Sequence, residues 1–339
     1  MPSKSRTTLA DVAARAGVSK MTASRALRDA ADVSPVNRKR VKDAAKTMGY
    51  VANPLAASLS NNRSNLIGVI VPSLSNIVFA EVLSGIADGI AGSTLQPVFG
   101  VTDYDPEAEL QTIRNMLSWN PAGLIVTGVD QSPEARTLLE HAAVPIVQIM
   151  DTDGIPIDAC VGLSHRAAGA EMAKTMLAQG HRSFGYIGCG LDKDTRAKKR
   201  HDAFKRALSE NGVILTAIQQ SDGPSTIAKG RVMTAEMLQL HPDLDCIYYA
   251  NDDLAAGGAL HCIAHALMTP QLAGFNGLDI IASLPIGVAT TQTQRREIGR
   301  AAAQLVRDRQ TQELPTHEKQ IVLTPRLVLD SRTLGVDMP

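Results

Sequence analysis

The sequence lacks the closely spaced cysteines that mark a disulfide framework or a zinc site. Its 339 residues contain four cysteines, and no two of them form a C-x-x-C pair. They are scattered among apolar residues, at Cys160, Cys189, Cys246 and Cys262. This pattern predicts reduced cysteines in the core of a cytoplasmic protein, with no metal site built on thiolates.

The sequence also shows no sign of a targeting segment or a membrane-spanning segment. The first residues are polar and basic with no apolar run behind them, which argues against a signal peptide. No window is long and apolar enough to span a bilayer. There is no G-x-S-x-G motif, no phosphate-binding P-loop and no metal-spaced His/Cys cluster. We therefore expect a cytoplasmic protein that is not an enzyme and that needs no cofactor.

Aromatic residues are scarce, at 3% of the chain, and charge is unevenly spread although its total is zero. Residues 1–63 contain 12 Lys/Arg and 4 Asp/Glu, and the remainder contains 22 Lys/Arg and 30 Asp/Glu. A basic first segment on a mildly acidic body predicts a polyanion partner for that segment only. The length predicts two or three domains.

The basic segment contains two short predicted helices joined by a tight turn. Thr8 can cap a helix from Leu9 to Ala16, and Gly17 permits a left-handed exit. Ser19 can cap a second helix that ends near Arg28. Ser34 and Pro35 are typical of the start of a third helix. Each helix has an apolar stripe rich in Ala, so the three can close a small core.

The outer face of the second helix suits a DNA major groove. It carries Lys20, Met21, Ser24, Arg25 and Arg28. Arg can donate two hydrogen bonds to guanine, Ser can pair with phosphate or base, and Met can contact a thymine methyl group. The alternative is a helical hairpin with a solvated basic face.

A break separates this segment from the rest of the chain. Asn53-Pro54 interrupts the pattern, residues 55–59 can form one short helix, and residues 60–64 read as a polar linker. So short a helix folds only when something packs against it. From Leu66 onward, apolar strands and helices alternate, with the last strands expected at residues 272–275 and 287–289. This predicts an α/β fold with parallel sheets in two lobes, and a ligand cleft at the carboxyl ends of the strands.

Several motifs occur together in one order: TLADVAARAGVSKMTASRAL, VANPLAASL, IGVIVPSL, GHRSFGYIG, ANDDLAAG and GFNGLD. With them the chain resembles the LacI family of transcription regulators from end to end. Among that family it is most similar to gluconate-operon repressors, through VSKMTASR, PSLSNIVFAEVLSGI, MLSWNPAGLI, LDKDT and NDDLA. The resemblance implies a helix-turn-helix head at residues 1–50, a hinge helix and linker at 51–65, and a periplasmic-binding-protein-like core at 66–339 that binds an effector and dimerises.

The resemblance also implies a homodimer that represses transcription by binding an inverted repeat in double-stranded DNA. Leu59 would be an apolar wedge between base pairs of the minor groove, and the alternative is a hinge residue that packs on the core. The DNA-contacting residues expected on this basis are Leu9, Ser19, Lys20, Met21, Ser24, Arg25, Arg28, Tyr50, Asn53, Ala56 and Leu59.

The effector is expected in the cleft between the lobes. Arg200 stands at the position of the family's ligand arginine, and Arg196 lies one turn earlier on the same face. Two guanidinium groups favour an anionic ligand, such as gluconate or a phosphorylated relative, although either could instead make an ion pair between the lobes. Phe79 could stack on the ligand or fill the lobe, and Asn251 could bind hydroxyls or cap a helix. The expected effector-binding residues are Ser73, Ser75, Phe79, Arg196, Arg200, Asn251 and Asn276.

Other readings remain open at this point. The effector could be a neutral sugar or a nucleoside, and the core could belong to a solute-binding protein. The basic segment and the lack of a signal peptide argue against the second of these.

Overall fold

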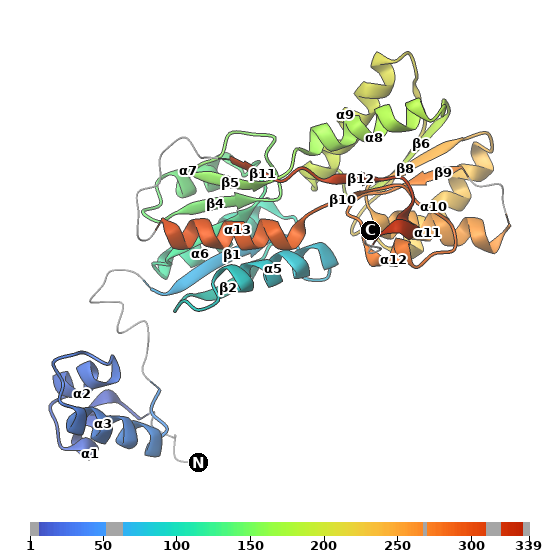
Figure 1. Ribbon diagram of the computed structural model, residues 1–339. Coiled ribbons are helices and arrows are strands. Elements are labelled where there is room, and N and C mark those ends of the chain that lie inside the picture. The colour runs from blue at the N-terminus through green and yellow to red at the C-terminus, as the bar shows by residue number, and fades with distance from the viewer. Residues whose placement is uncertain (1–6, 52–63, 267–269, 310–319, 335–339) are drawn as a thin grey trace. The chain divides into compact units, whose positions relative to one another are not determined.

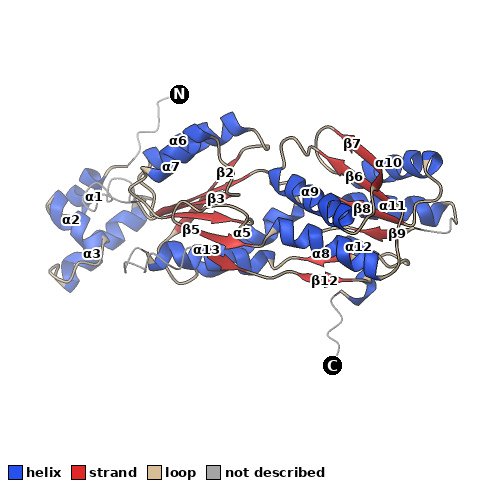
Figure 2. Ribbon diagram, turned by 90° about the horizontal axis from the view of Figure 1, so that it is seen from above, coloured by secondary structure: helices blue, strands red, loops and turns tan. Residues whose placement is uncertain are grey.

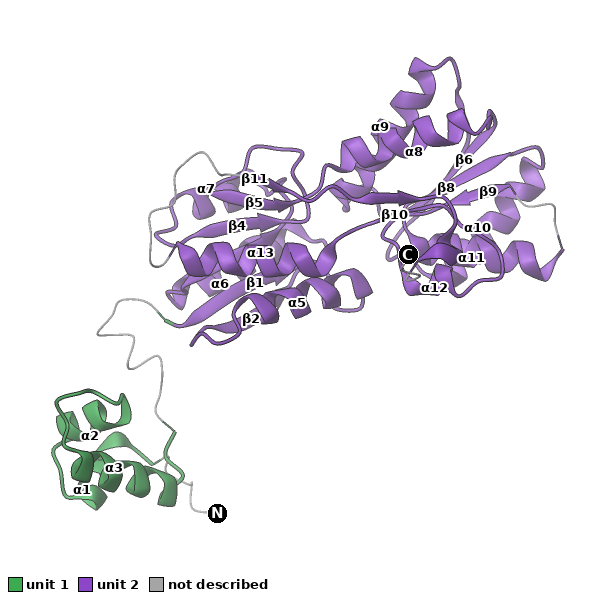
Figure 3. Ribbon diagram, in the orientation of Figure 1, with its two compact units in different colours: residues 1–64 green, residues 65–339 purple. Residues whose placement is uncertain are grey.

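The computed structural model describes residues 7–51, 64–266, 270–309 and 320–334. The chain divides into two compact units, residues 1–64 and 65–339, which Figure 3 shows in different colours. The predicted hinge helix at residues 55–59 lies outside the described residues. None of the described helices is long and apolar enough to cross a membrane.

The first unit, which we call the head, contains α1 (Leu9–Ala16), α2 (Lys20–Leu27) and α3 (Pro35–Thr47). The Thr8 hydroxyl accepts from the backbone N–H of Asp11, and the Asp11 carboxylate accepts from that of Thr8 at 2.8 Å, so both capping donors are satisfied. Gly17 ends α1 with φ of 67°. Ser19 caps α2 through Thr22 N–H at 3.1 Å. The predicted helix starts are confirmed.

The core of the head is built almost entirely from Ala and Val. Small side chains let the three helices approach closely, and partly buried Leu9, Met48 and Tyr50 close its edge. The buried members are Val12, Ala13, Ala16, Ala23, Ala26, Val33, Val41, Ala44 and Ala45. Such a core buries little apolar area, so we expect the head to be only marginally stable by itself.

The second unit begins with a lobe built on a six-stranded parallel sheet, in the order β11-β5-β4-β3-β1-β2. Helices α5 and α13 pack against each other on one face of the sheet, and α6 and α7 cover the other (Figure 2). The strands are β1 (Leu66–Val71), β2 (Gln96–Val101), β3 (Gly123–Thr127), β4 (Ile146–Ile149), β5 (Ala159–Gly162) and β11 (Gln320–Val322). The helices are α5 (Ile77–Gly89), α6 (Pro106–Ser118), α7 (Pro133–Glu140) and α13 (Arg295–Asp308).

The second lobe contains a four-stranded parallel sheet in the order β7-β6-β8-β9. Three of the five tyrosines of the chain, Tyr186, Tyr248 and Tyr249, are buried in it. The strands are β6 (Phe184–Cys189), β7 (Leu215–Ser221), β8 (Cys246–Tyr249) and β9 (Gln271–Ala273), with β10 (Thr290–Gln292) paired antiparallel to β12 (Arg326–Val328). The helices are α8 (His165–Ala178), α9 (Thr195–Glu210), α10 (Ile227–Leu240), α11 (Asp252–Ala264) and α12 (Asp279–Ala282), followed by a 3-10 turn at Ser331–Thr333.

The chain passes between the two lobes three times: from β5 to α8, from β10 to α13, and between β11 and β12 (Figure 1). Helices α8 and α9 of the second lobe cross closely at Gly169, which has no side chain. A Cβ at this position would overlap the backbone of Arg200. This contact fixes the depth of α9, the helix that carries Arg196 and Arg200.

The predicted α/β class and parallel sheets are confirmed, but the last expected strands are displaced. The strand expected at residues 272–275 ends at Ala273, and the one expected at 287–289 begins at Thr290 and pairs outside the main sheet. A turn at Asn276 and Gly277, where φ is 115° and 71°, follows the first of these strands. Strand β7 was not predicted because it lies at the sheet edge, where three of the seven residues of LTAIQQS are exposed and one is buried.

Candidate nucleic-acid interface and ligand cleft

Helix α2 packs on the head through Ala23 and Ala26 and leaves its opposite face open. Lys20, Arg25 and Arg28 are exposed on that helix and its C-terminal cap. Met21 is 71% exposed, a high value for an apolar side chain. Ser24 is half-buried between these two faces. The arrangement gives a short helix with cations and one flexible apolar side chain available to a groove of DNA.

The Arg25 guanidinium forms an ion pair with the Asp32 carboxylate that follows α2. Both side chains are about half exposed, at 46% and 49%. Ion pairs this exposed contribute about 0–1 kcal/mol, so a guanine edge or phosphate can replace Asp32 at low energetic cost. The pair therefore orients Arg25 without removing it from the candidate interface.

The other predicted DNA contacts fall into two groups. Leu9 and Tyr50 are partly buried against the core of the head, and the Ser19 hydroxyl caps α2. Asn53, Ala56 and Leu59 lie outside the described residues. The roles proposed for these residues on DNA stay predictions.

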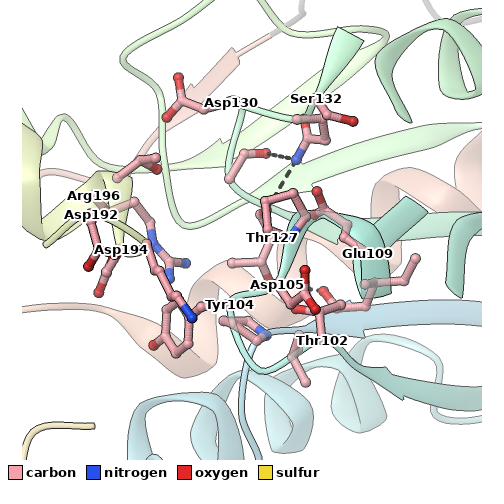
Figure 4. Close-up of a pocket in the computed structure, with 18 residues that line it drawn as sticks. Thr102, Tyr104, Asp105, Glu109, Thr127, Asp130, Ser132, Asp192, Asp194 and Arg196 are labelled. Atoms are coloured by element: carbon pink, nitrogen blue, oxygen red, sulfur yellow. Dashed lines mark hydrogen bonds and ion pairs between the residues drawn. The ribbon is translucent and has the colours of Figure 1, made fainter. Parts of the chain in front are cut away.

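A cavity of about 260 Å³, lined by polar and apolar groups, lies between the lobes of the second unit, outside the carboxyl ends of β1, β2 and β3 (Figure 4). This is where open α/β sheets bind ligands. Figure 4 shows Asp192, Asp194 and Arg196 on one side of it and Thr127, Glu109 and Ser132 on the other. The polar side chains that line it are Thr102, Tyr104, Asp105, Glu109, Thr127, Asp130, Gln131, Ser132, Asp192, Lys193, Asp194, Thr195 and Arg196.

Arg196 is the predicted effector residue that the structure places on this cavity. Its side chain is buried, its Nε lies 3.4 Å from the Asp194 carboxylate, and its guanidinium carbon lies 5.6 Å from the centroid of the Phe79 ring in the first lobe. No described residue accepts a hydrogen bond from its Nη1 atom, which is buried. Burial would raise the pKa of Asp194, but the charges of Arg196 and Arg200 hold it below its usual value. Arg196 therefore presents a charged donor with unused capacity.

Arg200 is held by the protein itself. Nη1 donates to Nδ1 of His165 and Nη2 to the carbonyl of Ala250, both at 2.9 Å, and the guanidinium lies 3.9 Å from the centroid of the Phe275 ring. Burial and the charge of Arg200 hold the pKa of His165 well below 6.5, so this imidazole is neutral. Its Nε2 then donates to the Met150 carbonyl at 2.7 Å. Two of the three nitrogens of Arg200 thus have internal partners.

Five other predicted effector residues lie away from the cavity lining. The hydroxyls of Ser73 and Ser75 bond to each other at 3.0 Å. Asn251 caps α11 through Leu254 N–H at 3.2 Å, the alternative that the sequence left open. The Asn276 carbonyl accepts from Arg295. Phe79 is buried in the first lobe beneath Arg196, so it fills the lobe and supports the guanidinium.

Sequence reasoning missed the acidic side of the cavity. Asp105 caps α6 through Glu107 N–H at 3.0 Å, and Glu109 follows one turn later on the same helix. Burial raises the pKa of Glu109 to about 7, although a hydrogen bond from Gln131 lowers it. The spacing of two acids one helical turn apart, directly after a strand, was the signal that could have identified them.

Comparison with known proteins agrees with this architecture. Residues 8–53 match the model of the bacterial regulatory proteins of the lacI family, and residues 64–323 match that of periplasmic binding proteins and the sugar-binding domain of the LacI family. The HTH-type transcriptional regulator GntR of Pseudomonas aeruginosa is 37% identical over 88% of this chain and 88% of its own length.

Solved structures give the same result. A LacI-family transcriptional regulator from Silicibacter pomeroyi is 46% identical, with a TM-score of 0.91 over 96% of this chain and 98% of that chain. The lac repressor dimer bound to operator shares the fold, with a TM-score of 0.78 at 22% identity over 97% of this chain and all of that chain. The chain therefore belongs to the LacI family of DNA-binding transcription regulators.

Proposed function

We propose that this regulator is a repressor that binds an inverted-repeat operator as a homodimer and whose operator affinity is changed by a small anionic sugar acid. The observation that carries the effector class is Arg196. It is a buried guanidinium with an Nη1 group that no described residue accepts from, placed on a cavity lined by hydroxyl and carboxyl groups. An Arg fork pairs with a ligand carboxylate, and the remaining lining suits the hydroxyls of a polyol.

Two of the five carboxyl groups that line the cavity are paired with cations, which limits their repulsion of an anionic ligand. Asp194 is paired with Arg196, and Asp130 with Lys199. Glu109, with a pKa of about 7, is partly protonated at neutral pH. A cavity of about 260 Å³ is near the lower limit of ordinary ligand sites, which favours a compact molecule such as gluconate or a phosphorylated relative.

Dimerisation has support in the first lobe of the second unit. The edge strand β2 exposes Phe99 and Val101. Leu74, in the turn before α5, and Ile77, the first residue of α5, are also exposed, and each of the four is more than one third accessible. Exposed apolar residues on an edge strand are suited to an interface with a second copy. Closure of the cleft around the effector would alter how two such lobes meet. That coupling is typically ~1–3 kcal/mol and acts in both directions.

Calorimetry of the full chain with gluconate, 6-phosphogluconate and glucose tests the effector class. We expect one of the two acids to bind at least tenfold more tightly than glucose. Tightest binding by glucose, or by a nucleoside included as a fourth ligand, would overturn the anionic assignment and favour a neutral effector.

A further inference from the structure

Lys199 connects the two lobes of the second unit. It lies on α9 in the second lobe, and its Nζ is 2.6 Å from the Asp130 carboxylate and 2.7 Å from that of Asp151. These two acids follow β3 and β4 of the first lobe. The Lys199 side chain is 10% exposed and that of Asp151 is fully buried. We call these three residues the clasp.

The other cations near the start of α9 behave differently. Lys198 pairs with Asp202 one turn along the same helix, and Arg196 pairs with Asp194 at the helix cap. Within the part of the chain that the structure describes, Lys199 is the cation of α9 whose ion pairs cross between the lobes. Burial alone would lower the pKa of Lys199. The hydrogen bonds to Asp130 and Asp151 outweigh that effect, so the pKa is raised above its ordinary value and the ammonium stays charged.

The clasp also affects the net charge beside the cavity. Asp130 lines the cavity, whereas Lys199 lines a separate hollow between α8 and α9 and pairs with Asp130. With the ammonium in place, one positive charge faces two carboxylates. Without it, both carboxylates remain uncompensated close to the cavity, where low dielectric strengthens repulsion of an anion. A neutral polyol would not suffer this repulsion, because its hydroxyls can donate to a carboxylate.

We propose that Lys199 is a specificity-determining residue of the ligand cleft: it holds the lobes together through Asp130 and Asp151 and compensates one of their two negative charges, which weakens the repulsion of a ligand carboxylate. The part of this inference that concerns the ligand rests on the proposed function. The part that concerns the clasp rests on the geometry of Lys199 and its two acids alone.

Hydrogen exchange of the full ligand-free chain tests the clasp. Lys199→Met should speed amide exchange at least tenfold in residues 128–132 and 150–154, the two loops that carry the acids. Lys198→Met is the matched control, because it removes the neighbouring charge of the same helix and should leave both loops unchanged. Wild-type exchange rates in both loops of Lys199→Met would overturn the clasp.

Calorimetry with gluconate and glucose tests the specificity role. Lys199→Met should weaken gluconate binding at least tenfold and glucose binding less than threefold. Asp130→Asn retains the pair between Lys199 and Asp151 and should bind gluconate at least as tightly as wild type, so it decides the matter if Lys199→Met does not fold. Equal losses for both sugars, or weaker gluconate binding in Asp130→Asn, would overturn the specificity role. If wild type binds neither sugar, the proposed effector and the specificity role both fall, and hydrogen exchange alone decides on the clasp.

Discussion

The head and the ligand cleft use arginine in opposite ways. Arg25 and Arg28 are exposed on the head, whereas Arg196 and Arg200 are less than 9% exposed in the second unit. A long polyanion supplies many charges at once, so exposed cations suffice and their desolvation cost stays small. A small ligand offers one charge, and burial strengthens the few interactions that it can make. The location of arginine thus distinguishes the surface proposed to read DNA from the cleft proposed to bind the effector.

The largest expected loss of ligand affinity comes from removing the buried charge of Arg196. Arg196→Met should weaken gluconate binding about 100-fold, because both a charge and a donor fork are lost. Arg196→Lys keeps the charge without the fork and should lose about tenfold. Calorimetry measures both, with the exposed Arg206→Met on the same helix as control. Unchanged affinity in Arg196→Met would remove the main support for an anionic effector.

Removing an exposed arginine from the head should affect DNA alone. Arg25→Ala should cost about 1–3 kcal/mol of operator affinity, the range for one bidentate base contact, and leave gluconate binding unchanged. Lys39→Ala on α3, which pairs with Asp43, is the control. Fluorescence anisotropy with operator DNA at several salt concentrations measures both. If Arg25→Ala binds as tightly as Lys39→Ala, α2 does not lie in the groove as proposed.

The core of the head is smaller than the cores of the second unit, so we expect the head to tolerate a larger buried side chain less well. Ala23 is fully buried in the small core of the head, so Ala23→Leu should destabilise that unit by about 1–3 kcal/mol through overpacking. Ala14→Leu, at an exposed position of α1, should be nearly neutral. Calorimetric unfolding should show a lower transition for the head in Ala23→Leu and an unchanged transition for the second unit. A shift in both transitions would mean that the two units do not unfold independently.

The smallest expected effect concerns pH. Burial raises the pKa of Glu109 to about 7, so this group is neutral below that pH and becomes a carboxylate above it. Its charge would repel an anionic ligand, so gluconate affinity should fall about tenfold between pH 6 and pH 8. Glu109→Gln should abolish most of that dependence, as measured by calorimetry in buffers of matched ionic strength. An equally steep pH profile in the variant would assign the titration to another group.

Local patterns in the sequence predicted the fold well where short-range physics decides it. Capping residues placed the helices of the head, and apolar runs such as residues 66–71 identified buried parallel strands. The strand at residues 290–292 was misplaced, because it pairs with β12, and local propensity does not encode a pairing this distant in sequence. The edge strand β7 was missed because half of its side chains face solvent.

The candidate site was predictable only in part, for a similar reason. Arg196 could be assigned to the cleft from its place at the start of a helix after β6. The internal partners of Arg200, at His165 and Ala250, are distant in sequence, and so are the acids that Lys199 binds. Which cation remains available to a ligand is decided by these long-range contacts, and residue type and spacing do not encode them.

The most direct test of the account is a genome-wide footprint of the tagged full-length protein in cells grown with and without gluconate. The account predicts a small set of sites with two-fold sequence symmetry, whose occupancy changes at least fivefold when gluconate is supplied. Identical occupancy at the same sites with gluconate, 6-phosphogluconate or neither would contradict a regulator controlled by a sugar acid, and binding without any shared sequence would contradict operator recognition by the head.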